Sequence, residues 1–250
     1  MNIGRIVVPP GVPDGFALFY TTRDFPGFLT DDVARELIGL IEERFGIAAS
    51  LTTCNQVHGT TSECGSHAAA LDARASEGGG MAAALRGYWR ECDSCDALYS
   101  HAPNTALGIK VADCLPVTMI DPSHSVIANI HSGWRGAAQA ITAKTLDTLI
   151  RETPFDPASA KAWLGPSIRV CCFEVGEEVA EQFDQTFVDR THAKPHVDIP
   201  AFTKAVLRDR GFADDAVIDT ELCTRCEGSI FHSYRRDRKG GGRNLALVAQ

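Results

Sequence analysis

Several patterns that would decide the class of this protein are absent from its sequence. It holds no long run of Lys or Arg, and its formal net charge is −8, from 24 basic and 32 acidic residues. A protein that follows a phosphate backbone normally presents a basic face, so we expect no nucleic-acid partner. It also lacks the run of about eighteen apolar residues that a membrane span requires, so we expect no membrane partner.

A secretory signal is not expected either. The chain begins with MNIGRIVVPPGVPDGF, which holds one early Arg and too short an apolar run before its paired prolines. The expected location is therefore the cytoplasm. In that reducing compartment, nine cysteines indicate thiols, metal ligands or redox centres rather than disulfides, and their odd number points the same way.

Length and composition are those of an ordinary globular protein. The 250 residues are 44% hydrophobic and 22% charged, which allows an ample core without disulfide or metal staples. No internal repeat is present. The one compositionally loose stretch, residues 67–87, is HAAALDARASEGGGMAAALRG. We predict a single domain over residues 1–250, with a variable Gly/Ala-rich insertion at about 65–91.

Helical and strand patterns alternate along the chain. Thr30 can cap a helix in which Val33 and Leu37 recur at helical spacing. Four β-prone segments then lie close together and are predicted to form one sheet: DALYS (96–100), TALGIKVAD (105–113), LPVTMID (115–121) and SVIANI (125–130). Further helices are predicted at 137–152, 177–187 and 199–211, and a strand at 161–168. The class is α/β, with two sheets or one large sheet covered by helices.

Three segments place a metal-capable side chain beside a backbone turn. They contain His58 in NQVHG, Cys114 in ADCLP and His131 in IHSGWRG, and the last two sit where an apolar run ends. Such positions project side chains from a rigid scaffold into a cleft. Two imidazoles and one thiolate suit Zn²⁺, and three ligands leave the fourth tetrahedral position open for water or substrate.

A structural interpretation of each residue stands beside the catalytic one. A lone histidine at a strand end is more often a hydrogen-bonding residue, and a lone cysteine is commonly a small buried hydrophobe. No short-range ligand pair such as His-Glu-x-x-His is present. Spacing alone therefore favours the structural interpretation.

Five ordered motifs change that balance. NQVHG, VADCLPV, HSGWRGAAQA, WLGPSIRVCCFEVGEEV and FHSYRRDRKGGGRNLALV together resemble the YfiH family, also called the laccase-domain or multicopper polyphenol oxidase family. The resemblance implies a single YfiH-like domain, a mixed-sheet α-β-β-α sandwich, with a metal site at His58, Cys114 and His131. Family members are described as purine nucleoside phosphorylases, adenosine deaminases, polyphenol oxidases and peptidoglycan editing factors. The N-terminal TTRDFPGFLTDDV departs from the family pattern by lacking its Gly-Ser-rich turn and Asn.

The two nucleoside activities need different groups. An open zinc site lowers the pKa of its water toward about 7, which would allow attack on the amino-bearing carbon of adenosine. Phosphorolysis instead needs a held phosphate, and the planar fork of arginine matches its oxygens. Arg135, Arg235 and Arg236 are the candidates. Their ordinary alternative is a solvated loop with local ion pairs.

Asp113 adjoins Cys114 and is a candidate catalytic residue, either as a proton shuttle or as an orienter of a ligand histidine. Adjacent residues on an extended strand point to opposite faces, however. A structural role in capping the turn is therefore equally compatible with its position.

Copper oxidase chemistry fits the composition less well. A blue-copper centre with a trinuclear cluster needs about ten histidine ligands, several of them in His-x-His pairs. This chain has eight histidines and no such pair. Cu²⁺ could still enter the three-ligand site, since it outcompetes Zn²⁺ at most nitrogen and sulfur sites.

Two further cysteine pairs have the spacing of a four-cysteine zinc site, Cys92-x-x-Cys95 and Cys223-x-x-Cys226. Buried or reduced thiols are the preferred interpretation of these pairs. The adjacent Cys171 and Cys172 are interpreted as packing after a turn.

The leading hypothesis is a zinc-dependent purine nucleoside enzyme that takes nucleoside and phosphate, with Cys114, His131 and Asp113 catalytic. A second makes Cys114 a nucleophile and His131 its base, in a cytoplasmic hydrolase such as a peptidoglycan precursor editing factor, because the catalytic domain of cytotoxic necrotizing toxins resembles this family in fold. A copper-dependent polyphenol oxidase and a non-catalytic metal-binding module are the third and fourth hypotheses. The oligomeric state is not predicted.

Overall fold

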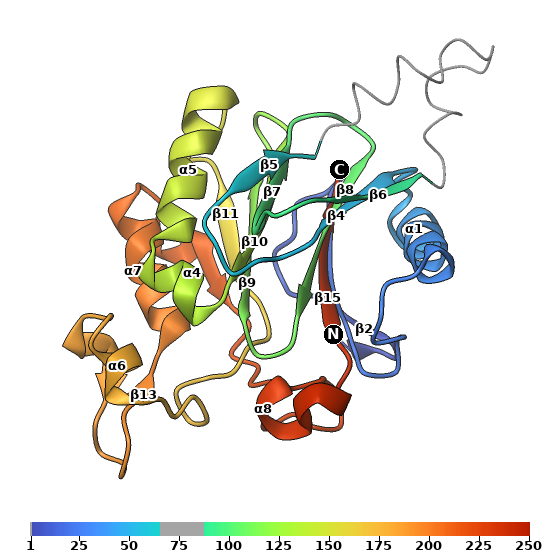
Figure 1. Ribbon diagram of the computed structural model, residues 1–250. Coiled ribbons are helices and arrows are strands. Elements are labelled where there is room, and N and C mark those ends of the chain that lie inside the picture. The colour runs from blue at the N-terminus through green and yellow to red at the C-terminus, as the bar shows by residue number, and fades with distance from the viewer. Residues whose placement is uncertain (1, 66–87) are drawn as a thin grey trace, which may run out of the picture.

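The computed structural model describes residues 2–65 and 88–250. The predicted insertion at 65–91 therefore lies mostly outside the described residues. Two mixed sheets form the centre of the molecule (Figure 1). The first contains, in spatial order, β1 (Asn2–Ile3), β2 (Ile6–Val7), β3 (Ala17–Thr21), β15 (Asn244–Ala249), β8 (Thr105–Val111), β4 (Ser50–Cys54) and β6 (Trp89–Cys92). The second contains β14 (Val217–Asp219), β11 (Lys161–Leu164), β9 (Leu115–Asp121), β10 (Val126–Ser132), β7 (Ala97–Ser100) and β5 (Ser62–Cys64).

The outer face of the first sheet is covered by helix α1 (Asp31–Phe45). The hydroxyl of Thr30 accepts a hydrogen bond from the backbone N–H of Val33 at 3.4 Å, as expected of an N-cap. Leu37 faces the sheet, and the helix ends at Gly46, whose φ of 71° lies in the left-handed region that glycine tolerates. The predicted N-terminal helix is confirmed.

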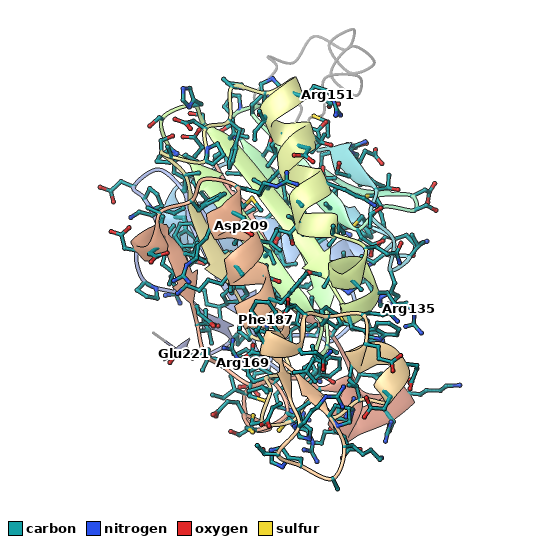
Figure 2. All side chains as sticks on the ribbon, turned by 90° about the vertical axis from the view of Figure 1, so that its left-hand side faces the viewer. Arg135, Arg151, Arg169, Phe187, Asp209 and Glu221 are labelled. Carbon is teal, nitrogen blue, oxygen red and sulfur yellow. The ribbon has the colours of Figure 1, made fainter. Side chains whose placement is uncertain are left out.

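A helical layer covers the outer face of the second sheet. It consists of α4 (Trp134–Ala138), α5 (Ile141–Glu152) and α7 (Ile199–Asp209). The helix predicted at 137–152 is broken at Ala140, whose positive φ of 62° separates α4 from α5. Figure 2 shows this layer face-on, with Arg151 and Arg135 toward opposite ends of it.

The shorter elements are α6 (Glu177–Ala180), the paired strands β12 (Val188–Asp189) and β13 (His196–Val197), and α8 (Tyr234–Asp237), which lies below the two sheets in Figure 1. None of the helices in the described part of the chain is both long and apolar enough to cross a membrane.

The inner faces of the two sheets pack against each other. Alternate residues of β8, Leu107 and Ile109, meet Ile120 and Ile127 of the second sheet in one buried cluster. The side chain of Asn129 crosses this interface, because its amide nitrogen donates to the carbonyl oxygen of Ala246 at 2.9 Å. Helix, sheet, sheet and helix therefore follow in layers, which confirms the predicted α-β-β-α sandwich.

One detail of the sheet prediction was wrong. The segment TALGIKVAD forms β8, which pairs with β4 and β15 in the first sheet, whereas DALYS, LPVTMID and SVIANI form β7, β9 and β10 in the second. The chain changes sheets at the turn of residues 112–114, where Asp113 has a φ of 83°. The β-prone composition of these segments predicted the strands but carried no information about which sheet each would join.

Three such crossings occur at the same end of the sandwich. Strands β4, β6 and β8 run parallel in the first sheet, and they lead into β5, β7 and β9, which run in one direction in the second. The three connecting loops hold His58, Asp96 and Cys114 respectively. Residues far apart in the sequence are thereby gathered at one end of the fold.

Candidate metal centre and substrate cavity

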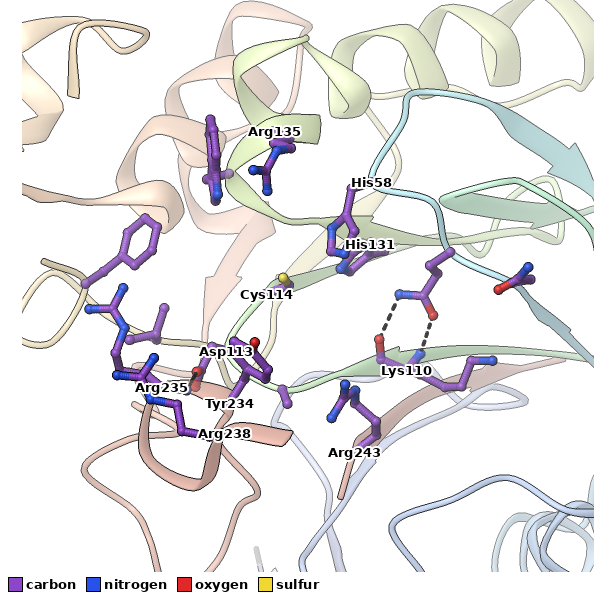
Figure 3. Close-up of a pocket in the computed structure, with 16 residues that line it drawn as sticks. His58, Lys110, Asp113, Cys114, His131, Arg135, Tyr234, Arg235, Arg238 and Arg243 are labelled. Carbon is purple, nitrogen blue, oxygen red and sulfur yellow. Dashed lines mark hydrogen bonds between the residues drawn. The ribbon is translucent and has the colours of Figure 1, made fainter. Parts of the chain in front are cut away.

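Three potential ligands converge where the sheets change over. The ligand atoms of His58, Cys114 and His131 all lie within 4.8 Å of one another. His131 reaches this point because β10 pairs antiparallel with β9 and sets His131 opposite Pro116, two residues beyond Cys114. Figure 3 shows the two imidazoles side by side, with the sulfur of Cys114 facing them. The structure thus brings together all three residues that the sequence analysis singled out.

Because Gly133 has no side chain, the space between these three ligand atoms stays open. A Cβ atom built on it would lie 3.0 Å from Sγ of Cys114, 3.4 Å from Nδ1 of His58 and 3.6 Å from Nε2 of His131. The φ of Gly133 is −67°, so its backbone does not require glycine. We infer that the residue is glycine because a side chain would occupy the centre of the ligand set.

Asp96 orients His131, and sequence reasoning did not find it. Its buried carboxylate lies with Oδ1 2.8 Å from Nδ1 of His131. Because an ionised carboxylate only accepts, Nδ1 carries a proton, and Nε2 is the ring nitrogen that faces Cys114 and His58 and that could bind a metal once its own proton is lost. A carboxylate behind a histidine is the usual partner of a metal-ligating imidazole.

The same carboxylate also shapes the loop that holds His58. It accepts backbone N–H bonds from His58 at 3.0 Å and from Gly59 at 2.6 Å. His58 itself has a φ of 60°, a strained value for a residue with a side chain. Burial alone would raise the pKa of Asp96, but His131 and these N–H donors lower it on balance, so the carboxylate stays ionised.

The two histidines have opposite electrostatic surroundings. Burial opposes protonation of His131, yet the Cys114 sulfur and Asp96 outweigh it and raise its pKa to about 9. Desolvation and the neighbouring His131 lower the pKa of His58, and Arg135 and Arg243 add to this effect. Without a metal ion, His131 is therefore the protonated member of the pair at neutral pH.

The donor set fits a borderline or soft divalent metal. Two imidazole nitrogens and one sulfur suit zinc or copper, and a three-ligand tetrahedral site keeps one position open. Asp96 supplies the carboxylate behind His131. His58 is exposed, Cys114 half-buried and His131 buried, so the group faces the surface on one side.

A cavity of about 760 Å³ opens in front of these ligands. That size matches pockets that enclose small organic ligands. Aromatic rings and basic side chains share its wall: Trp134, Phe173, Tyr234, Lys110, Arg135, Arg235, Arg238 and Arg243. Although the whole protein is acidic, the lining is strongly basic, and Figure 3 shows its basic side chains on several sides of Cys114.

The three predicted phosphate-binding arginines differ in their placement. Arg135 and Arg235 line the cavity. Within residues 4–65 and 88–250, neither forms an ion pair with a carboxylate. Arg135 stacks over Trp134, and Arg235 donates to the carbonyl of Glu174 at 2.9 Å.

Arg236 is used elsewhere in the fold. Its guanidinium donates to the carboxylate of Asp237 at 2.7 Å and to the carbonyl oxygens of Phe231 and Thr224 at 2.7 and 3.1 Å. It is not among the residues that line the cavity. These contacts favour a structural role for this arginine.

Asp113 borders the cavity, but its carboxylate is engaged. Oδ1 accepts from the hydroxyl of Thr224 at 2.7 Å, and Oδ2 accepts from the backbone N–H of Arg235 at 2.6 Å. These bonds join the turn before β9 to the segment that carries Arg235. The arrangement suits a positioning role better than a proton shuttle.

Several other lining residues were not found from the sequence. Lys110 lies on β8, and Gln56 brackets it by accepting from its backbone N–H and donating to its carbonyl. Arg238 and Arg243 belong to the C-terminal motif, where the sequence analysis chose Arg235 and Arg236 instead. The run of basic residues in this motif was the available sequence signal. The sequence did not show which of its members would line the cavity.

The fold and this site together define a mixed α/β sandwich with a metal-capable group in the wall of a basic cavity. A family model described as "Multi-copper polyphenol oxidoreductase laccase" matches residues 30–250. The chain therefore belongs to this family, as its motifs predicted.

Curated relatives carry the names of nucleoside enzymes. Adenosine deaminase RL5, from an unknown prokaryotic organism, is 33% identical over 164 residues, 62% of each chain. Purine nucleoside phosphorylase YlmD of Bacillus subtilis (strain 168) is 27% identical over 170 residues, 65% of this chain and 61% of its own. Purine nucleoside phosphorylase YfiH of Escherichia coli (strain K12) is 33% identical over 152 residues, 58% and 60% of the two chains. The matches thus span about three fifths of these relatives.

Solved structures match nearly the whole chain. YlmD from Geobacillus stearothermophilus superposes with a TM-score of 0.82 at 22% identity, covering 100% of this chain and 97% of its own. The hypothetical protein YfiH of Bacillus licheniformis gives 0.76 at 23% identity, covering 94% and 92%. These likenesses support the fold.

Proposed function

We propose that the protein is a cytoplasmic zinc-dependent purine nucleoside enzyme. It cleaves adenosine, inosine or methylthioadenosine with phosphate, and it deaminates adenosine as an accessory activity. The observation that carries the proposal is the convergence of His58, Cys114 and His131 in the wall of a cavity that is otherwise lined by basic and aromatic side chains. The names of the relatives support the same substrate class.

The metal ligands would be Nδ1 of His58, Sγ of Cys114 and Nε2 of His131. A zinc ion held there would supply Lewis-acid chemistry at its open position, where water loses its proton near neutral pH. Asp96 keeps His131 in the tautomer that such binding needs. Asp113 acts as a positioning residue through its bond to the backbone of Arg235.

The aromatic and the basic lining residues bind different parts of the substrates. Trp134, Phe173 and Tyr234 offer flat apolar surfaces for a purine ring, with a hydroxyl on the last. Arg135 and Arg235 hold the phosphate dianion. In phosphorolysis this phosphate attacks C1′ of the ribose, the glycosidic bond breaks, and the base leaves with its bonding electrons.

A hydrolase using Cys114 as nucleophile is the second candidate. It is favoured by the hydrogen bond between His131 and the sulfur of Cys114, together with the raised pKa of that histidine. A histidine close to the sulfur is what a cysteine nucleophile needs as its base. Such an enzyme requires an unligated sulfur, so it would be active only without metal at this position.

A multicopper oxidase has less support. Among the described residues, His58 and His131 are the histidines that occur in a metal-capable cluster. A trinuclear copper cluster beside a blue-copper centre needs many more. Copper at the three-ligand site would give at most a single-ion centre.

The test is a product assay on protein of measured metal content. Purified protein is incubated with adenosine, inosine or methylthioadenosine, with and without phosphate, and products are separated by chromatography. We expect free base and sugar phosphate only with phosphate, inosine from adenosine, and no product with Cys114→Ala. Turnover that survives this substitution would refute the proposal, and an amide or wall-precursor product that forms only in metal-free protein would support the hydrolase.

A further inference from the structure

Four cysteines outside the cavity form a second cluster. Cys171 and Cys172 come from the loop after β11, and Cys223 and Cys226 come from the loop after β14. Their sulfur atoms all lie within 4.8 Å of one another. Cys172 and Cys223 are buried, whereas Cys171 and Cys226 are exposed at the surface. All nine cysteines have free thiols in this structure.

The three sulfur separations among Cys171, Cys172 and Cys226 match a tetrahedral metal site. Sγ of Cys226 lies 3.4 Å from that of Cys172 and 3.8 Å from that of Cys171, and the adjacent pair is 3.7 Å apart. With a Zn–S bond of about 2.3 Å, tetrahedral geometry sets neighbouring sulfurs roughly 3.8 Å apart. A disulfide would require about 2.05 Å. We propose that Cys171, Cys172, Cys223 and Cys226 bind one structural zinc ion.

Hydrogen-bond donors surround the sulfur of Cys223. Its sulfur accepts N–H bonds from Arg225 and Cys226, in the turn of the Cys-x-x-Cys segment, and from Arg169 across the loop. The Arg225 side chain donates to the sulfur of Cys172, which places a positive charge against the net negative charge of four thiolates and Zn²⁺.

This grouping differs from the one that the sequence spacing offered. Cys92 and Cys95 hydrogen-bond with each other, and Cys95 also with Cys54, in the core between the sheets. The partners of Cys223 and Cys226 are instead the adjacent Cys171 and Cys172, which were interpreted as packing residues. Cys223-x-x-Cys226 therefore belongs to a four-cysteine cluster, as the spacing suggested, but with Cys171 and Cys172 in place of Cys92 and Cys95.

Of the two loops joined by this cluster, the first lines the substrate cavity and the second contacts a residue of its wall. Ile168 and Phe173, which flank the first cysteine pair, line the cavity. Thr224, between the second pair, donates to Asp113 beside Cys114. The site is closed, since four protein ligands leave no position for water, in contrast with the open group at His58. Zinc uptake displaces the remaining thiol protons to solvent.

Metal content measures this site directly. Protein purified with zinc and dialysed is analysed for metal per chain by mass spectrometry. We expect two ions in the wild type, one in Cys226→Ser and one in Cys114→Ala. Cys64→Ser, which changes a cysteine outside both clusters, keeps two. A Cys226→Ser protein that retains two ions, or a wild type that holds only the ion lost with Cys114, overturns the proposal.

Cobalt distinguishes the two sites without relying on the serine variant. The Cys114→Ala protein is stripped of zinc, kept reduced and titrated with Co²⁺. We expect the intense sulfur-to-cobalt charge-transfer bands of a four-thiolate ion, reached at one equivalent, together with protection of the exposed Cys171 and Cys226 from alkylation. Folded protein that shows no such bands, or that leaves both thiols reactive with cobalt bound, contradicts the assignment.

Discussion

Nδ1 of His131 lies 2.8 Å from Oδ1 of Asp96, and both side chains are buried at the end of the sandwich where the chain changes sheets. The same carboxylate accepts the backbone N–H of His58. One acidic residue thus orients one candidate metal ligand through its ring and another through its backbone. The geometry of the site depends on Asp96 as much as on the ligands themselves.

Substituting Asp96→Asn should weaken metal binding by roughly 10- to 100-fold, as loss of a carboxylate behind a ligand histidine typically does. Affinity is measured by competition with a chromophoric chelator. Asp121→Asn is the matched control, because Asp121 is also buried and lies 2.8 Å from a histidine, His124, away from the cavity. Equal losses in the two variants would mean that Asp96 acts only through stability.

Metal affinity of the three-ligand site should rise with pH. The pKa of His131 is raised to about 9 in the metal-free protein, so below that pH an ion must displace its proton. Affinity should therefore increase about tenfold per pH unit from this proton and lose that dependence above pH 9. Asp96→Asn should move the change of slope to lower pH. Metal titrations in the Cys226→Ser protein report on the three-ligand site alone. If Asp96→Asn leaves the pH dependence of metal affinity unchanged, the proton that the metal displaces is not the one on His131.

Gly133→Ala should empty the metal site while the fold persists. The added methyl carbon would lie 3.0 Å from Sγ of Cys114, too close for the sulfur to stay in place, yet the backbone angle of Gly133 accepts alanine. We expect loss of one ion per chain with a melting temperature within a few degrees of wild type. Gly39→Ala, on α1 with open space around it, is the control. Full metal content in Gly133→Ala would show that the ligands do not converge on this space.

Substitutions of Arg235 and Arg236 should have different effects. Arg235→Gln removes a cavity cation and should raise the KM for phosphate by about tenfold or more, as expected for loss of a charge-assisted hydrogen bond. Arg236→Gln removes bonds to Asp237 and to backbone carbonyls and should lower the free energy of unfolding by about 2 kcal/mol with an unchanged KM. Initial rates at a series of phosphate concentrations give the KM, and urea unfolding gives the free energy of unfolding. The reverse pattern would assign the phosphate to Arg236.

Local chemistry made part of the fold predictable. The Thr30 cap and the short β-prone runs are encoded within a few residues, so α1 and strands β7 to β10 could be placed. The sheet that β8 joins depends instead on pairing with β4 and β15, which lie far away in the sequence. The three ligands were identified from motifs, whereas spacing alone favoured a structural role for them.

Other site residues left no local signature. Asp96 stands 35 residues before His131, and nothing around it marks it as the partner of an imidazole. Cys171 and Cys226 are 55 residues apart, and they meet only because the loops after β11 and β14 run side by side. Tertiary structure selects such partners, so sequence spacing suggested a different cysteine grouping.

The most direct test of the account is whether activity follows the ion at His58, Cys114 and His131. Wild-type protein and His58→Ala are stripped of metal and reloaded with counted zinc, and inosine phosphorolysis is measured at each step. We predict that wild-type turnover disappears on stripping and returns with reloading, while His58→Ala lacks one ion per chain and its turnover. Metal-free protein with full activity, or His58→Ala with both the ion and turnover intact, would contradict the account.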